Sequence, residues 1–166
     1  MVRRNLWGCS KQIKSLAYTS LVGSQLEYAS AVWDPHLQKH CHKLDMVQRR
    51  GSRFVMADYR YTSSPSEMIS KLQWQSLPVR RQAARLTLLY KAIQGTACIP
   101  IDNLQRPTRT TRNSSHLSFI ALSSHCDTYK FSFYPRTVTD WNNLPYAIHC
   151  LPSTDSFTLA LVSHLD

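Results

Sequence analysis

Glycine and acidic residues are scarce in this chain. Only 4 of the 166 residues are Gly, and 10 Asp and Glu stand against 20 Lys and Arg. Scarce glycine combined with long amphipathic runs favours helix. No apolar run approaches the length of a membrane span, so we expect no membrane partner. The apolar content of 43% fits a globular domain with one ordinary hydrophobic core.

Paired or clustered cysteines are also lacking. The five that occur are odd in number, widely scattered and without a CxxC spacing: Cys9, Cys41, Cys98, Cys126 and Cys150. Such a distribution is typical of reduced thiols, so we expect a cytoplasmic or nuclear protein. His36 and His40 have the helical spacing that can hold zinc, but the neighbouring Cys41 and His42 point to other faces. We therefore expect no metal site.

The excess of basic residues indicates the class of partner. The formal net charge is +10 and the isoelectric point is near 9.7. A surface of this kind attracts polyanions, most simply the backbone of RNA or DNA. The alternative is a solvated basic surface without a partner.

The apolar periodicity predicts a mainly α-helical fold, a bundle of about three long helices. The first covers residues 10–32, with Ser10 as N-cap and a kink or split at Gly23 and Ser24. The second runs over about residues 35–56 and the third from about Leu77 to Gly95, a natural C-cap. A short helix over residues 67–72, capped by Ser66, lies between them.

The C-terminal part is predicted to be less regular. Residues 96–115 are expected to be an exposed basic linker, and residues 117–120 and 128–131 short strands or extended segments. A helix ending near Asn143 begins at Lys130 or Phe131, or at about Tyr134 if Pro135 lies in its first turn. Ser153 caps a final helix through about His164. These elements divide the chain into a basic helical region (1–95), the linker (96–115) and a C-terminal segment (116–166).

Two distant stretches resemble a known family. The first contains Leu26-Glu27-Tyr28 and Trp33, and is followed by Val47-Gln48-Arg49-Arg50. The second is the Phe-x-x-Arg-x-x-x-x-Trp-Asn-x-Leu-Pro element between Phe133 and Pro145. In this order they resemble the C-terminal end of the reverse transcriptase of non-LTR (LINE-type, jockey-like) retrotransposons, over about residues 6–165. The resemblance implies a thumb-like helical region and the segment after it, which help to hold the template and primer. Family members often have Arg-Pro where this chain has Gly23-Ser24.

The catalytic residues of that family have no counterpart in this chain. Its RNA-directed DNA polymerases carry an aromatic-x-Asp-Asp motif in the palm, upstream of the region resembled here, and this chain has no Asp-Asp pair. Polymerase chemistry needs carboxylates that hold two metal ions about 4 Å apart. We therefore expect no catalysis and no cofactor for this chain alone. Mg²⁺ is implied only for the missing palm, a separate domain that is itself a candidate partner.

The interpretation that follows is a reverse transcriptase fragment that retains nucleic-acid backbone binding. Two basic helices with few acidic residues are expected to line a groove for template and primer, and a solvated basic face is the alternative. Arg136 is equally suited to pairing with Glu27 or Asp140. The candidate nucleic-acid-binding residues are Lys39, Lys43, Arg49, Arg50, Arg53, Arg80, Arg81, Arg85 and Arg136.

A second group of residues is expected to be structural. Trp141 and Asn142 have the chemistry of a base-stacking platform, but a core position at helical spacing from Val138 is favoured. The structural residues are Glu27, Tyr28, Trp33, Trp141, Asn142, Leu144 and Pro145. The alternative function is a helical protein-interaction module, or a non-functional remnant of a transposable element. The sequence leaves the oligomeric state open.

Overall fold

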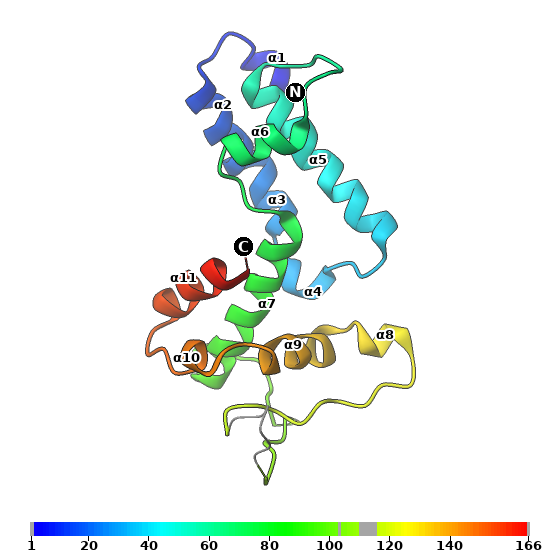
Figure 1. The fold of residues 1–166 in the computed structure, drawn as a ribbon, viewed down its shortest axis with the longest axis vertical. Helices are drawn as coiled ribbons and strands as arrows, with labels where there is room; N and C mark the ends of the chain where they lie inside the picture. The colour runs from blue at the N-terminus through cyan, green and yellow to red at the C-terminus, as the bar shows by residue number, and fades with distance from the viewer. Residues whose placement is uncertain (1, 103, 110–115, 166) are drawn as a thin grey trace. The chain divides into compact units, whose positions relative to one another are not determined.

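The computed structural model describes residues 2–102, 104–109 and 116–165 (Figure 1). These ranges are mainly α-helical and contain no β-strand, which confirms the predicted fold class. None of the helices described combines the length and the apolar character needed to cross a bilayer. The elements are α1 (Val2–Asn5), α2 (Lys11–Ala17), the π-helix η1 (Tyr18–Gly23), α3 (Ser24–Glu27), α4 (Ser30–Trp33), α5 (Gln38–Met56), α6 (Pro65–Lys71), α7 (Leu77–Ile93), α8 (Asp127–Lys130), α9 (Phe133–Asn142), α10 (Tyr146–His149) and α11 (Thr154–Leu165).

The chain divides into two compact units, each with its own hydrophobic cluster. Unit 1 comprises Met1–Ser30 and Pro35–Pro78, and unit 2 comprises Ala31–Asp34 and Val79–Asp166. The division differs from the boundaries at 95 and 115 expected from the sequence, because α7 supplies core residues to unit 2 from Ala83 onward. The sequence predicted one hydrophobic core, whereas the structure has two clusters of buried apolar residues, one in each unit.

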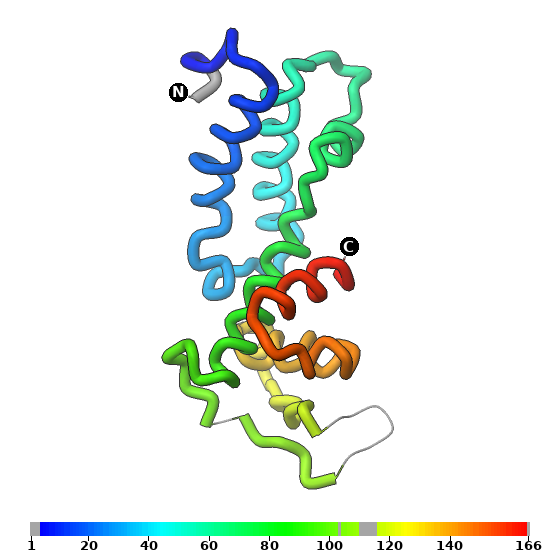
Figure 2. The backbone as a smooth tube through the Cα atoms, turned by 90° about the vertical axis from the view of Figure 1, so that its left-hand side faces the viewer, coloured from blue at the N-terminus to red at the C-terminus, as the bar shows by residue number. Residues whose placement is uncertain are grey.

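The N-terminal half of unit 1 is a helical rod of α2, η1 and α3. Ser10 caps it, since the Ile13 N–H donates to Ser10 Oγ at 3.4 Å, as predicted. The predicted interruption at Gly23 and Ser24 is a π-helical turn that ends at Gly23 without splitting the rod. The rod ends before Ala29, whose φ is 49°. Figure 2 shows the rod and α5 running antiparallel within this unit.

The long helix α5 begins at Gln38, later than predicted, and ends as predicted at Met56. Ala57 follows in the left-handed conformation, with φ 52°. The short helix α6 begins two residues earlier than predicted and is capped by Ser64, not Ser66. Pro65 fits its first turn because the N–H it lacks would have no helical partner there. The predicted start and end of α7 are confirmed, with Gly95 at φ 72° beyond its end.

The core of unit 1 depends on a close approach between Tyr18 and Gly51. The Tyr18 ring stacks on Trp74, with ring centroids 4.5 Å apart and planes 13° apart, and packs with Phe54 and Val55. A Cβ added at Gly51 would lie 2.6 Å from Cζ and 2.7 Å from Cδ2 of the Tyr18 ring. Glycine at position 51 therefore allows this ring to cross α5 against its backbone.

The core of unit 2 forms around Trp141 on α9. The Trp141 ring is buried, and its Nε1–H donates to the Leu117 carbonyl at 3.0 Å, which confirms its role as a core anchor. The Asn142 side chain accepts from the Phe119 N–H at 3.0 Å and donates to the Phe119 carbonyl at 2.8 Å. These bonds hold residues 117–120, which form neither helix nor strand, against α9. Leu144 is buried in the same core, whereas Pro145 is exposed.

Several C-terminal predictions need correction. α9 begins at Phe133 with Pro135 in its first turn, as the later of the two predicted starts required. Residues 128–130 lie in the short helix α8, so the predicted strand there is wrong. The linker prediction is wrong at Leu104, which is buried in the core of unit 2. Arg112 and the other residues of 110–115 lie outside the described ranges. Ser153 caps α11 as predicted, accepting from the Ser156 N–H at 3.2 Å.

His149 makes the stability of unit 2 depend on pH. Its Nε2–H donates to the Trp141 carbonyl at 3.0 Å and its ring stacks on Trp141, while Nδ1 has no hydrogen-bond partner among the residues described. Burial lowers the pKa of His149 from its ordinary value of 6.5, with the hydrogen bond to Trp141 opposing this. At a pH just below 6.5 the imidazole ring therefore stays neutral in the folded state but becomes protonated in the unfolded chain.

We expect the free energy of unfolding of unit 2 to be fully retained above pH 6.5 and to fall as the pH drops below that value. Urea unfolding at pH 7.5 and 5.5 measures the loss. His149→Gln keeps an N–H donor for the Trp141 carbonyl but does not titrate, so its loss over this interval should be smaller. An equal loss in both proteins would assign the pH dependence to other groups.

Candidate functional site

Four cations lie along one face of α5. At about 100° per residue, Lys39, Lys43, Arg50 and Arg53 fall within an arc of about 80° on this helix. We call these four residues the α5 stripe. Asp45, the acid within this helix, falls on the opposite side by the same count. Arg49 lies about 100° from Arg50 and is an additional cation at the border of the stripe.

Most of the stripe is available to a partner. Lys39, Lys43 and Arg50 are exposed, as is Arg49, and within the described ranges none of these side chains forms an ion pair. Arg53 is half-buried and donates to the carbonyls of Arg60 and Ser63, at 3.4 Å each. The structure therefore places the predicted binding residues of α5 on one side of unit 1, with Arg53 partly engaged.

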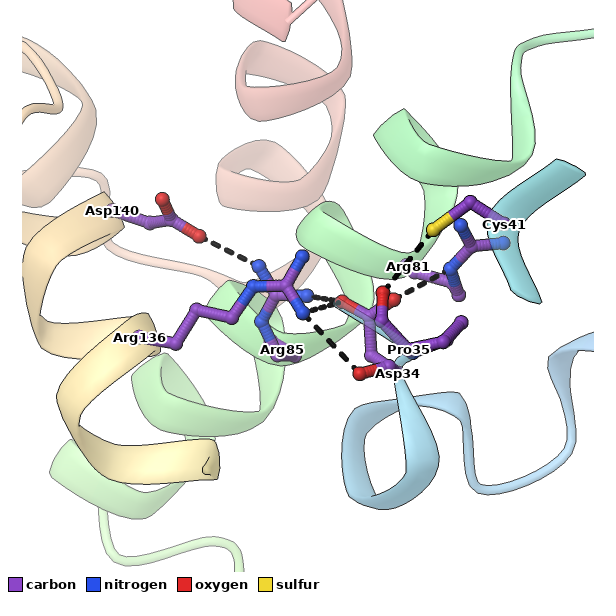
Figure 3. Close-up of polar contacts among 7 residues, drawn as sticks. All are labelled: Asp34, Pro35, Cys41, Arg81, Arg85, Arg136 and Asp140. Carbon is purple, nitrogen blue, oxygen red and sulfur yellow. Dashed lines mark hydrogen bonds and ion pairs between the residues drawn. The ribbon is translucent and has the colours of Figure 1, made fainter. Parts of the chain in front are cut away.

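The arginines of α7 have a different environment. Arg81 and Arg85, one turn apart on one face of the helix, are each 2% exposed. Both point to Asp34, which directly follows α4 (Figure 3). Arg81 Nε lies 2.6 Å from Asp34 Oδ1, and Arg85 Nη1 pairs with Asp34 Oδ2. The prediction that Arg81 and Arg85 bind nucleic acid is wrong, because both guanidinium groups are buried and neutralised inside unit 2. Arg80 is half-buried.

Arg136 on α9 completes the cluster. Its Nη1 lies 3.0 Å from Asp34 Oδ2 and donates to the Asp34 carbonyl at 3.3 Å. Asp34 is thus a partner of Arg136 that the sequence analysis did not propose, and this pairing weakens the prediction of a phosphate contact at Arg136. Asp140, one turn along α9, pairs with Arg85 Nη2 at 2.6 Å. We call these five residues the Asp34 cluster: Asp34, Arg81, Arg85, Arg136 and Asp140.

The electrostatics of the cluster are those of a buried ion network. The Asp34 side chain is 5% exposed and three guanidinium groups surround its carboxylate. Burial lowers the pKa of Arg85, and the positive charge of Arg136 lowers it further, while Asp140 acts in the opposite direction. Moving these charges out of water costs free energy, which their mutual attraction offsets. Removing one member of the network therefore leaves a buried charge without compensation. The chemistry of the Asp34 cluster is structural, since its charges are paired with one another and its most exposed members, Arg136 and Asp140, have side chains only 28% and 22% exposed.

Sequence reasoning missed Asp34, which it treated only as the helix boundary before Pro35. The sequence did contain part of the signal, since the arginines at positions 81 and 85 are one turn apart in a helix that has no acid of its own. Nothing singled out Asp34 as their partner, because Asp45, Asp58 and Glu67 are nearer to that helix in sequence. Three residues nearby were also expected to be structural. Tyr28 is 79% exposed and Trp33 is 38% exposed, so neither is a core residue, and Glu27 is half-buried.

The histidine and cysteine cluster at residues 36–42 forms no metal centre in the described residues. No group of three or more His, Cys, Asp or Glu side chains there is placed to hold an ion. Cys41 Sγ instead donates to the Pro35 carbonyl at 3.3 Å, within unit 1 (Figure 3). His36, His40 and His42 are exposed.

We expect Asp34→Asn to lower the free energy of unfolding of unit 2 by about 3–5 kcal/mol, because it leaves buried guanidinium groups without their shared carboxylate. The matched control is Asp140→Asn, which removes one bond from a more exposed carboxylate and should cost about 1–3 kcal/mol. Urea unfolding followed by the Trp141 indole N–H resonance reports unit 2. If Asp34→Asn unfolds at the same urea concentration as the parent, the cluster does not stabilise the fold.

Searches of protein-family models, of curated proteins and of solved structures found no match to this chain. Its chemistry must therefore be inferred from its own residues, above all the exposed α5 stripe and the buried Asp34 cluster.

Proposed function

We propose that this chain binds the sugar–phosphate backbone of RNA or DNA through the α5 stripe. In origin it would be the thumb and post-thumb region of a non-LTR retrotransposon reverse transcriptase, without the palm. The observation that carries the binding proposal is the exposure of Lys39, Lys43 and Arg50 on one helix face, beside Arg49 and without paired acids among the described residues.

The dimensions of the stripe suit a nucleic-acid strand. Lys39 and Arg53 are 14 positions apart on α5, which corresponds to a length of about 21 Å. Cations spaced along this length can neutralise several successive phosphates and release their counterions. Contacts of this kind are made to phosphate and not to base edges, so the binding would be tolerant of sequence.

The proposed surface is smaller than the sequence predicted. A groove between two basic helices required the arginines of α7, but Arg81 and Arg85 are used by Asp34 within unit 2. The remaining surface is one face of α5. In support of the proposed origin, the two stretches that resemble the reverse transcriptase family contact each other through Asp34 and Arg136.

The proposal assigns no catalysis to this chain. The metal-holding Asp-Asp pair of the family is absent from the sequence, and Mg²⁺ would belong to a separate palm domain. A palm domain is accordingly a candidate protein partner. The five cysteines are free thiols, as expected for a protein that acts in the cytoplasm or nucleus.

We expect the triple variant K39Q/K43Q/R50Q to weaken binding to an RNA–DNA hybrid and to reduce the salt dependence of that binding. Each lost phosphate contact should lower the slope of log K against log salt concentration by about 0.7–0.9, or about 2–3 in total. Fluorescence anisotropy with a labelled hybrid from 20 to about 200 mM salt measures both quantities.

The control is K11Q/K71Q/K91Q, which removes the same charge from exposed lysines outside the stripe. It should change the slope by much less. Equal effects of the two triple variants would mean that the net charge of the chain, and not the α5 stripe, attracts the polyanion. Undetectable binding of the parent protein to both the hybrid and a single strand at the lowest salt would reject the proposed function altogether.

An exposed apolar surface on unit 1 favours a second candidate function, protein association. Ile13, Leu16 and Leu21 on α2 and η1 are 50%, 69% and 58% exposed. Large apolar side chains exposed on consecutive elements are typical of a surface that another chain covers. This observation suits the alternative of a helical protein-interaction module.

If this surface drives self-association, the molar mass of the parent protein in light scattering should rise with concentration from about 1 to 100 μM, the range in which weak apolar contacts become populated. Leu16→Glu should abolish that rise, whereas Leu159→Glu, an equally exposed position in unit 2, should not. A constant monomer mass at every concentration would count against the second function as self-association.

A further inference from the structure

Two neighbouring cavities lie in unit 1 beside the α5 stripe. The larger, of about 480 Å³, is formed by η1, α5 and Tyr59. The smaller, of about 180 Å³, is bounded by Trp7, Lys14 and Ala57. Phe54 and Tyr59 line both, so the two cavities are adjacent. The larger one is lined by Tyr18, Val22, Val47, Arg50, Gly51, Arg53, Phe54 and Tyr59.

The walls of these cavities combine aromatic rings with cations. The aromatic residues are Trp7, Tyr18, Phe54 and Tyr59, and the cations are Lys14, Arg50 and Arg53. Among the residues that the structure describes, no Asp or Glu lines either cavity. Two of the cations, Arg50 and Arg53, also belong to the α5 stripe. An aromatic-walled cavity bordered by cations is complementary to a ligand that joins a flat ring to a negatively charged group.

Lys14 is the second observation that points to a bound anion. Its side chain lies at the smaller cavity in a residue only 7% exposed, and its Nζ is 5.9 Å from the centre of the Phe54 ring. Among the residues described it has no acidic partner. Because Lys14 lines the smaller cavity, a phosphate bound there would supply its ammonium group with a charge-assisted partner.

We infer that unit 1 holds one unstacked nucleotide of a single-stranded RNA or DNA, with its base in the larger cavity and its phosphate between Lys14 and Arg50. The inference rests on the proposed function and specifies its substrate as a single strand. An aromatic-lined cavity accepts any base face, and the phosphates of the neighbouring nucleotides would continue along the α5 stripe. A duplex cannot place a base there without unstacking it.

The volume and position of the larger cavity support a base over an aliphatic chain. Small-ligand sites occupy about 300–1,000 Å³, and the cavity at about 480 Å³ lies within that range. Stacking on aromatic side chains is the interaction by which proteins bind single strands without sequence preference. An aliphatic anion would use the apolar walls but would leave the cations along α5 unused.

The test compares three labelled probes in fluorescence anisotropy at one salt concentration. They are a single-stranded thymidine oligonucleotide, a strand of the same length in which every base is replaced by an abasic site, and an RNA–DNA hybrid of the same length. The inference predicts that the intact strand binds about tenfold more tightly than the abasic strand, since one stacked base contributes a factor of this order.

Three variants locate the effect. Val47→Phe fills the larger cavity. Tyr59→Ala replaces a loop residue whose aromatic ring lines both cavities. Lys14→Met removes the positive charge of Lys14 but keeps a side chain of similar length. Val47→Phe and Tyr59→Ala should each erase most of the difference between the intact and abasic strands. Lys14→Met should lower the affinity for the intact strand about tenfold. Val32→Phe and Lys11→Met are the matched controls at exposed positions and should change neither quantity.

The outcomes separate this inference from the proposed function. Equal affinity for intact and abasic strands, both lowered by K39Q/K43Q/R50Q, would overturn the base site and retain backbone binding. The same holds if the hybrid binds as tightly as the single strand and Val47→Phe has no effect. Failure of all three probes to bind would reject the proposed function itself. Binding of decyl phosphate that Val47→Phe abolishes, without any preference for the intact strand, would assign the cavity to an aliphatic anion.

Discussion

The fold of unit 2 depends on the carboxylate of Asp34. Its partners lie 47 and 102 positions away in sequence, at Arg81 and Arg136, so a single buried charge joins the end of α4 to α7 and α9. Burying this carboxylate costs several kcal/mol unless each nearby guanidinium group is positioned to compensate. An apolar contact would tolerate a shift of α9 against α7, whereas the ion network fixes their register.

The same network decides which cations a partner can reach. A net charge of +10 suggests a uniformly basic surface. However, Arg81, Arg85 and Arg136 form ion pairs with Asp34 and Asp140 inside unit 2. Charge counted from a sequence therefore overstates the binding surface wherever arginines are internal. What remains is organised by α5, where helical periodicity alone brings the cations to one face.

Local signals in the sequence predicted the helices well. The cap at Ser10, the end of α5 at Met56 and the stop at Gly95 follow from rules that involve a few neighbouring residues. The partner of Arg136 and the two-unit division could not be derived in this way, because both depend on contacts between distant segments. The crossing of Tyr18 over Gly51 is a further case, since only the folded chain reveals why position 51 lacks a side chain.

The two units differ in how many of their polar and aromatic groups are already used within the fold. In unit 2 the charged groups face one another and the aromatic groups are occupied by the core, as Trp141 and Asn142 show with their bonds to residues 117 and 119. In unit 1 the charges of α5 remain exposed and aromatic rings border open cavities. Polar groups already satisfied inside a fold have little left to offer a ligand, whereas Lys14 has a charge without an acidic partner among the described residues. This difference supports the proposal that an anionic partner binds unit 1.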